Sequence, residues 1–107
     1  MKRDEVWWVS FDPSVGGEVQ KKRLAVILSN DASNRHLNGV QVVRLTTQAD
    51  PVYPSEALVM VGKRRNKAMA DQLTTASKHR LLNKAGKLSR SDLRAVETAV
   101  KVQLGLG

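Results

Sequence analysis

Short apolar runs separated by polar or chain-breaking residues fill the first half of the chain. Four runs rich in apolar and β-branched residues predict short strands at residues 6–11, 24–28, 40–45 and 57–61. Asn38 and Gly39 predict a turn between the second and third strands, and Pro51 and Pro54 break the chain between the third and fourth. Such a series predicts a small, strongly bent antiparallel sheet.

The second half of the chain changes period. Residues 67–75 are consistent with a further strand and residues 78–82 with a short helical turn. Beyond them, one helical face carries four apolar residues, which are Leu93, Val96, Val100 and Leu104. Ser89 followed by Asp92 resembles a capping box, and Gly105 supplies a stop, so we predict a helix over residues 90–104. The fold class is therefore α+β and mainly β.

Length and composition exclude several classes of protein. We expect one domain over residues 1–107, because a chain of 107 residues is large enough for a single core but poorly suited to two. The absence of cysteine excludes disulfides and cysteine-based zinc sites. The longest apolar run, residues 24–28, is far shorter than the roughly 20 residues of a membrane span, and no signal-peptide pattern is present. We expect a cytoplasmic protein.

The positive charge is concentrated in one part of the chain. The net charge is +8, and residues 60–90 contain nine basic residues against one acid, Asp71. This window favours a polyanionic partner such as nucleic acid. A solvated surface, or a patch for an acidic protein segment, is the alternative.

Candidate chemistry lies at two strand ends. A basic cluster of Lys21, Lys22 and Arg23 leads into the strand at residues 24–28, and Thr46 and Thr47 end the strand at residues 40–45. An arginine fork pairs with phosphate oxygens, and threonine hydroxyls can donate to the same phosphate. This combination, without a metal-ligand cluster, suggests phosphodiester chemistry on RNA.

The ordered motifs resemble those of the MazF/PemK family of toxin endoribonucleases from bacterial toxin–antitoxin modules. The resemblance rests on a Trp-bearing first strand with an aromatic-Asp-Pro turn at residues 6–13 and on Gly17 and Glu18 followed by the basic stretch that leads to Ser29. It also rests on Thr46-Thr47-Gln48 and on Ala70-Asp71-Gln72. The family's usual proline after the arginine is Leu24 here, which affects the rigidity of the loop exit.

The resemblance implies an SH3-like antiparallel barrel with a C-terminal helix, shared with the CcdB gyrase poisons, and a homodimer silenced by a MazE-like antitoxin. It implies cleavage of single-stranded RNA, either messenger, ribosomal or transfer RNA, without metal or other cofactor. The residues expected at the catalytic site are Arg23, Thr46 and Asp71. Those expected to bind RNA are Glu18, Lys21, Lys22, Thr47, Gln48, Lys63, Arg64, Arg65 and Gln72. A non-catalytic gyrase poison and a general nucleic-acid-binding module are the alternatives.

Several side chains have more than one possible role. Thr46 either donates to a phosphate oxygen or satisfies local backbone groups at the strand end. Asp71 is either a general base or an ion-pair partner of a nearby arginine. His36 and His79 match no family motif and are expected at the surface. Trp7 and Trp8 could stack on RNA bases, but they occupy alternate faces of a strand, so at least one of them is expected in the core.

Overall fold

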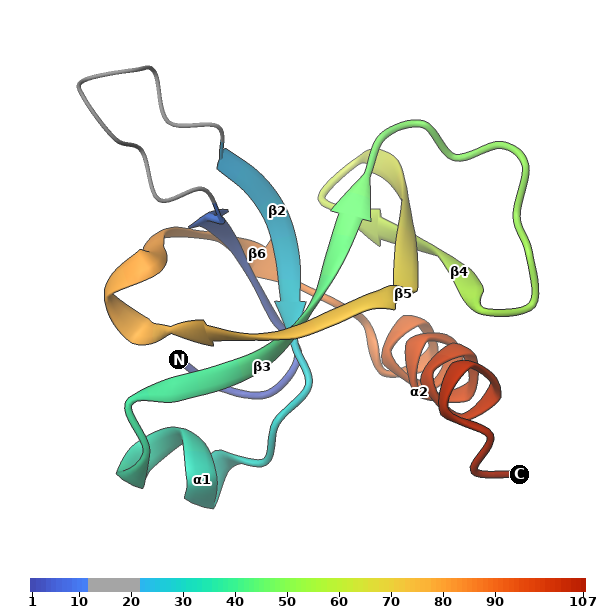
Figure 1. Cartoon of the computed structure of the whole chain (residues 1–107). Coiled ribbons are helices and arrows are strands. Elements are labelled where there is room, and N and C mark those ends of the chain that lie inside the picture. The colour runs from blue at the N-terminus through green and yellow to red at the C-terminus, as the bar shows by residue number, and fades with distance from the viewer. Residues whose placement is uncertain (12–21) are drawn as a thin grey trace.

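Six strands form one antiparallel sheet in the computed structural model, which describes residues 1–11 and 22–107. The strand order is β4-β5-β3-β2-β1-β6. The strands are β1 (Glu5–Ser10), β2 (Lys22–Ile27), β3 (Gly39–Thr46), β4 (Glu56–Val61), β5 (Arg64–Ser77) and β6 (Leu81–Lys87). Figure 1 shows the sheet curling into a half-barrel with the C-terminal helix α2 (Arg90–Leu104) beside it. The predicted fold class is confirmed.

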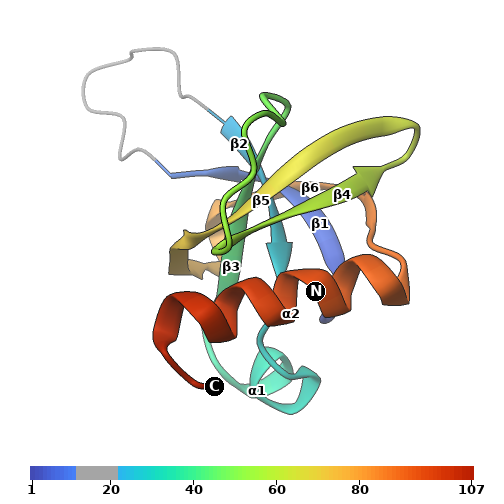
Figure 2. The same cartoon turned by 90° about the vertical axis from the view of Figure 1, so that its right-hand side faces the viewer.

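Apolar residues cover both faces of the sheet because side chains alternate along each strand. One face carries Val6, Val26 and Val43, and helix α2 packs on it against β4 and β5 (Figure 2). The other face holds a second cluster that includes Val9 and Ile27.

The two tryptophans are divided between these faces. Trp7 packs against the second cluster, where its indole N–H donates to Glu5 Oε1 at 3.0 Å. Trp8 lies on the α2 side of the sheet, opposite Leu24 of the neighbouring strand. Trp8 is therefore not part of the second cluster, in contrast to Trp7.

Helix α2 has the predicted bounds and ends. Ser89 Oγ accepts a hydrogen bond from the Asp92 N–H at 3.1 Å, and Gly105 ends the helix in the left-handed conformation with φ 69°. The Asp92 carboxylate instead accepts from the backbone N–H of Met60 on β4 at 2.9 Å. One residue of the first helical turn thus fastens the helix to an edge strand. Val96 is buried on the predicted face, whereas Leu104 at its end is exposed.

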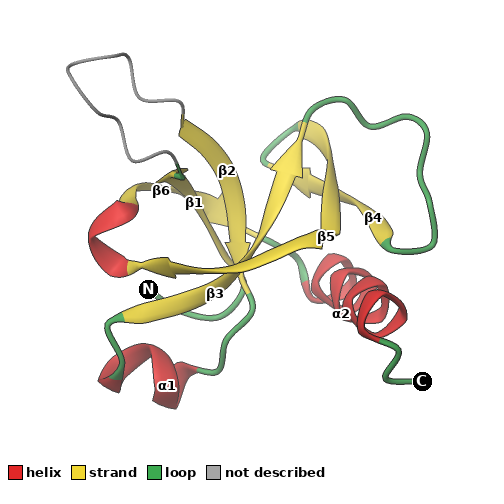
Figure 3. Cartoon of the chain, in the orientation of Figure 1, coloured by secondary structure: helices red, strands yellow, loops and turns green. Residues whose placement is uncertain are grey.

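Several elements differ from the sequence-based expectations. The polar connection after β2 contains a short helix, α1 (Asp31–His36), capped by the Asn30 side chain (Figure 3). The helical turn predicted at residues 78–82 is a 3-10 turn, η1 (Lys78–Arg80), and it leads into a sixth strand that the pattern did not predict. Strand β5 is also longer than predicted, with 14 residues.

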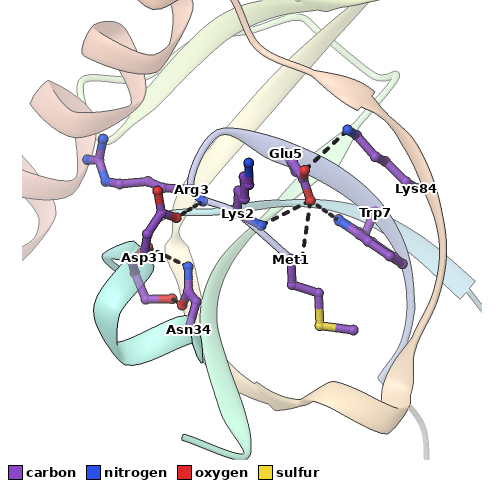
Figure 4. A network of polar contacts seen from close by, with 9 residues as sticks. Met1, Lys2, Arg3, Glu5, Trp7, Asp31, Asn34 and Lys84 are labelled. Atoms are coloured by element: carbon purple, nitrogen blue, oxygen red, sulfur yellow. Dashed lines mark hydrogen bonds and ion pairs between the residues drawn. The ribbon is translucent and has the colours of Figure 1, made fainter. Parts of the chain in front are cut away.

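A buried carboxylate organises the start of the chain (Figure 4). Glu5 accepts hydrogen bonds from the Lys2 backbone N–H and the Trp7 indole, both at 3.0 Å, and pairs with Lys84 Nζ at 3.2 Å. Burial by itself raises the pKa of Glu5, but these donors and the nearby terminal ammonium outweigh it and lower the pKa to about 2. Glu5 is therefore charged at neutral pH and joins β1 to β6.

Candidate functional site

The register of the central strands brings two of the three candidate catalytic residues, Arg23 and Thr46, to the same end of the sheet. Ala25 of β2 pairs with Arg44 of β3 in an antiparallel ladder. The β2–β3 ladder ends at this pair, and Arg23 and Thr46 each lie two residues beyond it on their own strands. The first residues of β2 and the last residues of β3 lie at the same end of the sheet in Figure 1. Two positions separated by a helix and a turn in the sequence thus become neighbours.

A cavity of about 450 Å³ lies at this end of the sheet. Its polar lining consists of Lys22, Arg23, Thr46, Thr47, Gln48 and Asn66, and three apolar residues, Trp8, Leu24 and Leu45, complete the wall. The volume falls within the range of about 300–1,000 Å³ that is usual for small-ligand sites. Five residues from the predicted site and a mainly apolar wall therefore share one cavity.

Arg23 is exposed, and its guanidinium makes one short-range contact, from Nη1 to the Lys22 carbonyl oxygen at 3.2 Å. No carboxylate within residues 1–11 and 22–107 pairs with it. A guanidinium held on a strand and unpaired in this part of the chain can bind a phosphate in a bidentate manner.

The Thr46 hydroxyl makes the local backbone contact that was one of its two expected roles. Its Oγ1 accepts a hydrogen bond from the Gln48 N–H at 3.2 Å, which is a local strand-end contact. A hydroxyl that accepts in this way still has its own proton to donate. The local bond orients the hydroxyl oxygen and leaves the O–H available to a ligand in the cavity.

Leu24, at the position of the family proline, is part of β2 and half-buried against the α2-side core. Its backbone is held by pairing with Trp8 on β1. The ladder therefore constrains this position in place of the proline ring.

Asp71 and Gln72 lie on β5 at exposed positions and do not line the cavity that contains Arg23. Gln72 Nε2 approaches the Asp71 carboxylate at 3.4 Å. Two nearby arginines bind elsewhere, since Arg65 lies 3.9 Å from Asp50 and Arg80 donates to the Ser10 carbonyl. A role for Asp71 in chemistry would thus require substrate to extend beyond the cavity.

The basic window does not form one surface. Lys63, Arg64 and Arg65 lie in the β4–β5 hairpin, whereas Lys78 and Arg80 lie in η1 at the other end of the long strand β5. Lys67 on β5 is 8 % exposed and pairs with Glu56 at 3.3 Å, while its Nζ donates to the Pro51 carbonyl at 2.9 Å. The excess charge is therefore divided, and Lys67 has a structural role in anchoring the loop after β3.

The remaining predicted residues are placed as follows. Glu18 and Lys21 lie outside the described residues. His36 and His79 are exposed, as expected. In the described part of the chain, no group of three or more His, Asp or Glu side chains is arranged to hold a metal ion. Within the same residues, no helix has the length and apolar character needed to cross a membrane.

Trp8 and Asn66 line the cavity but were not predicted as site residues. Asn66 follows a run of three basic residues, so the pattern there indicated a charged loop and not a buried position. In the fold, Asn66 pairs with Val59 on β4 and its side chain is buried.

A family model described as PemK-like, MazF-like toxin of type II toxin–antitoxin systems matches residues 2–104. The chain belongs to this toxin family. The MazF/PemK resemblance inferred from the motifs is thereby confirmed.

Two curated relatives extend over nearly all of this MazF-family chain. It is 36 % identical to endoribonuclease MazF9 of Mycobacterium tuberculosis, with 99 % of this chain and 98 % of the relative covered. It is 32 % identical to the endoribonuclease toxin MazF of Escherichia coli, with 92 % and 88 % covered. Both relatives carry the activity expected from the sequence in their names.

A solved mycobacterial endoribonuclease in complex with its cognate antitoxin has a similar fold. The TM-score is 0.83 at 27 % identity, and the alignment covers 100 % of this chain and 97 % of that one. A MazF structure from Deinococcus radiodurans superposes with a TM-score of 0.81 at 23 % identity over 98 % and 96 % of the two chains, which supports the fold. The curled sheet with a C-terminal helix is therefore the family architecture.

Proposed function

We propose that this protein is a sequence-selective endoribonuclease toxin that cleaves single-stranded RNA without a metal ion. The observation that carries the proposal is the cavity shared by Arg23, Thr46, Thr47 and Gln48, in a chain whose curated relatives are named endoribonucleases. The same names do not favour the gyrase-poison alternative.

RNA contains its own nucleophile, the 2′-hydroxyl, so the enzyme has to align that oxygen with phosphorus and stabilise the charge that develops. The 2′-oxygen forms a bond to phosphorus and loses its proton as the bond from phosphorus to the 5′-oxygen breaks. The 5′-oxygen takes up a proton, which leaves a cyclic 2′,3′-phosphate and a 5′-hydroxyl. No oxidant, metal or second substrate is needed.

Arg23 stabilises the negative charge on the phosphorane oxygens, because its guanidinium stays protonated and makes two parallel hydrogen bonds. It also shields the departing 5′-oxygen. Thr46 donates its O–H to a non-bridging oxygen while Gln48 N–H holds its oxygen in place. We assign the general base to Asp71, which is exposed and lies outside the cavity, so this role requires the substrate to extend to β5.

RNA on either side of the scissile phosphate has basic and polar groups to contact. We assign this role to Lys22, Thr47 and Gln48 at the cavity. We also assign it to four exposed residues outside the cavity, which are Lys63, Arg64 and Arg65 in the β4–β5 hairpin and Gln72 on β5. Glu18 and Lys21 in the preceding loop are assigned to RNA on the sequence motif alone.

We further propose that a MazE-like antitoxin neutralises the protein in the cytoplasm and that two copies form a homodimer. The similar mycobacterial structure contains a cognate antitoxin, which supports the first partner. Exposed apolar side chains on β4 and α2, namely Leu58, Met60, Val102 and Leu104, supply surface for a protein interface.

The test is incubation of the pure protein with a long unstructured RNA and a matched DNA in excess chelator, followed by mapping of the new ends. We expect discrete RNA fragments with 5′-hydroxyl ends and intact DNA. Cleavage that depends on added magnesium, or equal loss of the DNA, would refute the mechanism.

A further inference from the structure

Two buried polar atoms lack a hydrogen-bond partner within the described residues, and they are Arg44 Nε and Asn66 Oδ1. The Arg44 guanidinium lies 5.2 Å from the centre of the Phe11 ring, so its charge has a favourable contact. Asn66 is 1 % exposed, and its Nδ2 donates to the Arg64 carbonyl at 3.3 Å, which leaves the amide oxygen as an acceptor without a donor.

A buried acceptor without a donor destabilises a fold by about 1–3 kcal/mol, and native proteins contain few of them. The backbone around Asn66 is regular, because Asn66 pairs with Val59 on β4 and comes directly before Lys67, the first β5 residue paired with β3. A donor from a ligand therefore accounts for the unsatisfied oxygen better than a packing defect.

Asn66 lies in the wall of the cavity that also contains Arg23 and Thr46. The β3–β5 register pairs Thr46 with Lys67, so the next residues in each direction, Thr47 and Asn66, are neighbours. Trp8, Leu24 and Leu45 complete this side of the wall. One aromatic side chain, two aliphatic side chains and one amide thus adjoin the proposed phosphate site.

We propose that this part of the cavity is a nucleobase subsite in which Asn66 selects the base. The base packs on Trp8, and one of its N–H groups donates to Asn66 Oδ1. The inference rests on the proposed function and adds to it, because phosphate contacts by Arg23 carry no sequence information whereas contacts to a base edge do. Aromatic packing binds any base, so the amide oxygen is the element that discriminates.

The first experiment compares cleavage maps of a long RNA pool for the wild-type protein and two variants. Asn66→Ala should flatten the base preference at one position beside the cut by about tenfold or more, which is the loss expected from one buried hydrogen bond. Asn34→Ala is the matched control. Asn34 is 3 % exposed, but its amide is fully used by Ser29, so this variant should lose stability and keep the wild-type map.

A second measurement uses the wild-type protein and therefore does not depend on the folding of a variant. RNA in which the preferred base carries a methyl group on its donor N–H should be cut at least tenfold more slowly than the unmodified RNA. An unchanged rate with the methylated base, or an unchanged map for folded Asn66→Ala, would overturn the inference while leaving the endoribonuclease proposal intact.

Nucleotide binding tests the base subsite independently of RNA cleavage. The four 3′-nucleoside monophosphates are titrated while tryptophan fluorescence is followed, with Trp8→Phe to identify the reporter. We expect one nucleotide to bind most tightly and Asn66→Ala to remove that advantage. If the protein cleaves no RNA but shows this selective binding, the subsite stands and the catalytic proposal fails. Equal binding of all four nucleotides would overturn the subsite.

Discussion

Replacing Glu5 with glutamine should make the free energy of unfolding of this protein less dependent on pH below about pH 4.5. Glu5 has a pKa of about 2 in the fold against the ordinary value of 4.5, a difference that corresponds to about 3 kcal/mol at neutral pH. Its side chain is 11 % exposed, so screening by solvent removes little of this contribution. Glutamine can accept the same hydrogen bonds from Lys2 and Trp7 but lacks the charge that pairs with Lys84, and so imitates the protonated acid.

The sign follows from the lowered pKa. The contribution of Glu5 is complete above the unfolded-state pKa near 4.5 and is lost as the pH falls toward 2. The difference in unfolding free energy between wild type and Glu5→Gln should therefore decrease by about 1.4 kcal/mol per pH unit below pH 4.5, or about 2 kcal/mol by pH 3.

The assay is urea unfolding of both proteins, followed by circular dichroism, at several values between about pH 7 and pH 3. Asp50→Asn is the control, because the Asp50 side chain is 84 % exposed and its pair with Arg65 is long, at 3.9 Å. Its difference from wild type should stay near zero throughout. A difference for Glu5→Gln that is flat across this range would show that the network in Figure 4 does not hold the charged carboxylate.

Three further predictions concern the site and its support. Arg23→Ala should lower the single-turnover cleavage rate by at least about a hundredfold, and Thr46→Ala by less, with the fold unchanged by circular dichroism; a folded Arg23→Ala at the wild-type rate would remove Arg23 from the mechanism. Lys67→Ala should destabilise the fold by about 3–5 kcal/mol in urea unfolding, because it leaves Glu56 without its buried partner, and a cost below 1 kcal/mol would contradict that assignment. Lys63→Gln should reduce the slope of RNA affinity against salt by about one unit without changing the rate at saturating RNA; an unchanged slope would place Lys63 away from the RNA.

The sequence predicts helix α2 fully because its ends are encoded locally. Ser89 caps the first turn and Gly105 takes up the left-handed conformation that ends the last one. Helix α1 is different, since its six residues are polar and its capping residue Asn30 resembles an ordinary turn residue. A short helix without an apolar stripe has no periodic signal to detect.

Strand β6 was missed because its outward residues do not alternate clearly with apolar ones. Leu81 is buried, but the five following residues, 82–86, range from exposed to half-buried. Its stability comes from pairing with β1, including the contact of Lys84 with Glu5, and those partners are far apart in the sequence.

The candidate site was predictable only where a motif marks it. Arg23 and the residues from Thr46 to Gln48 share the cavity as expected, because strand register places them at one end of the sheet. Asn66 could not be predicted, since an unsatisfied oxygen depends on which donors surround it in three dimensions.

The placement of α1 has a practical consequence for engineering the protein. The segment between Arg23 and Thr46 reverses direction at the end of the sheet opposite the cavity, where α1 lies (Figure 1). The ladder from Ala25 to Ile27 sets the alignment of the two cavity residues independently of the length of this connection. Extending a surface loop also destabilises a fold only slightly, because each doubling of loop length raises the free energy of loop closure by about 0.6 kcal/mol. Leu37 and Asn38 both have exposed side chains, so a dye attached at either position lies at the end of the sheet away from the cavity.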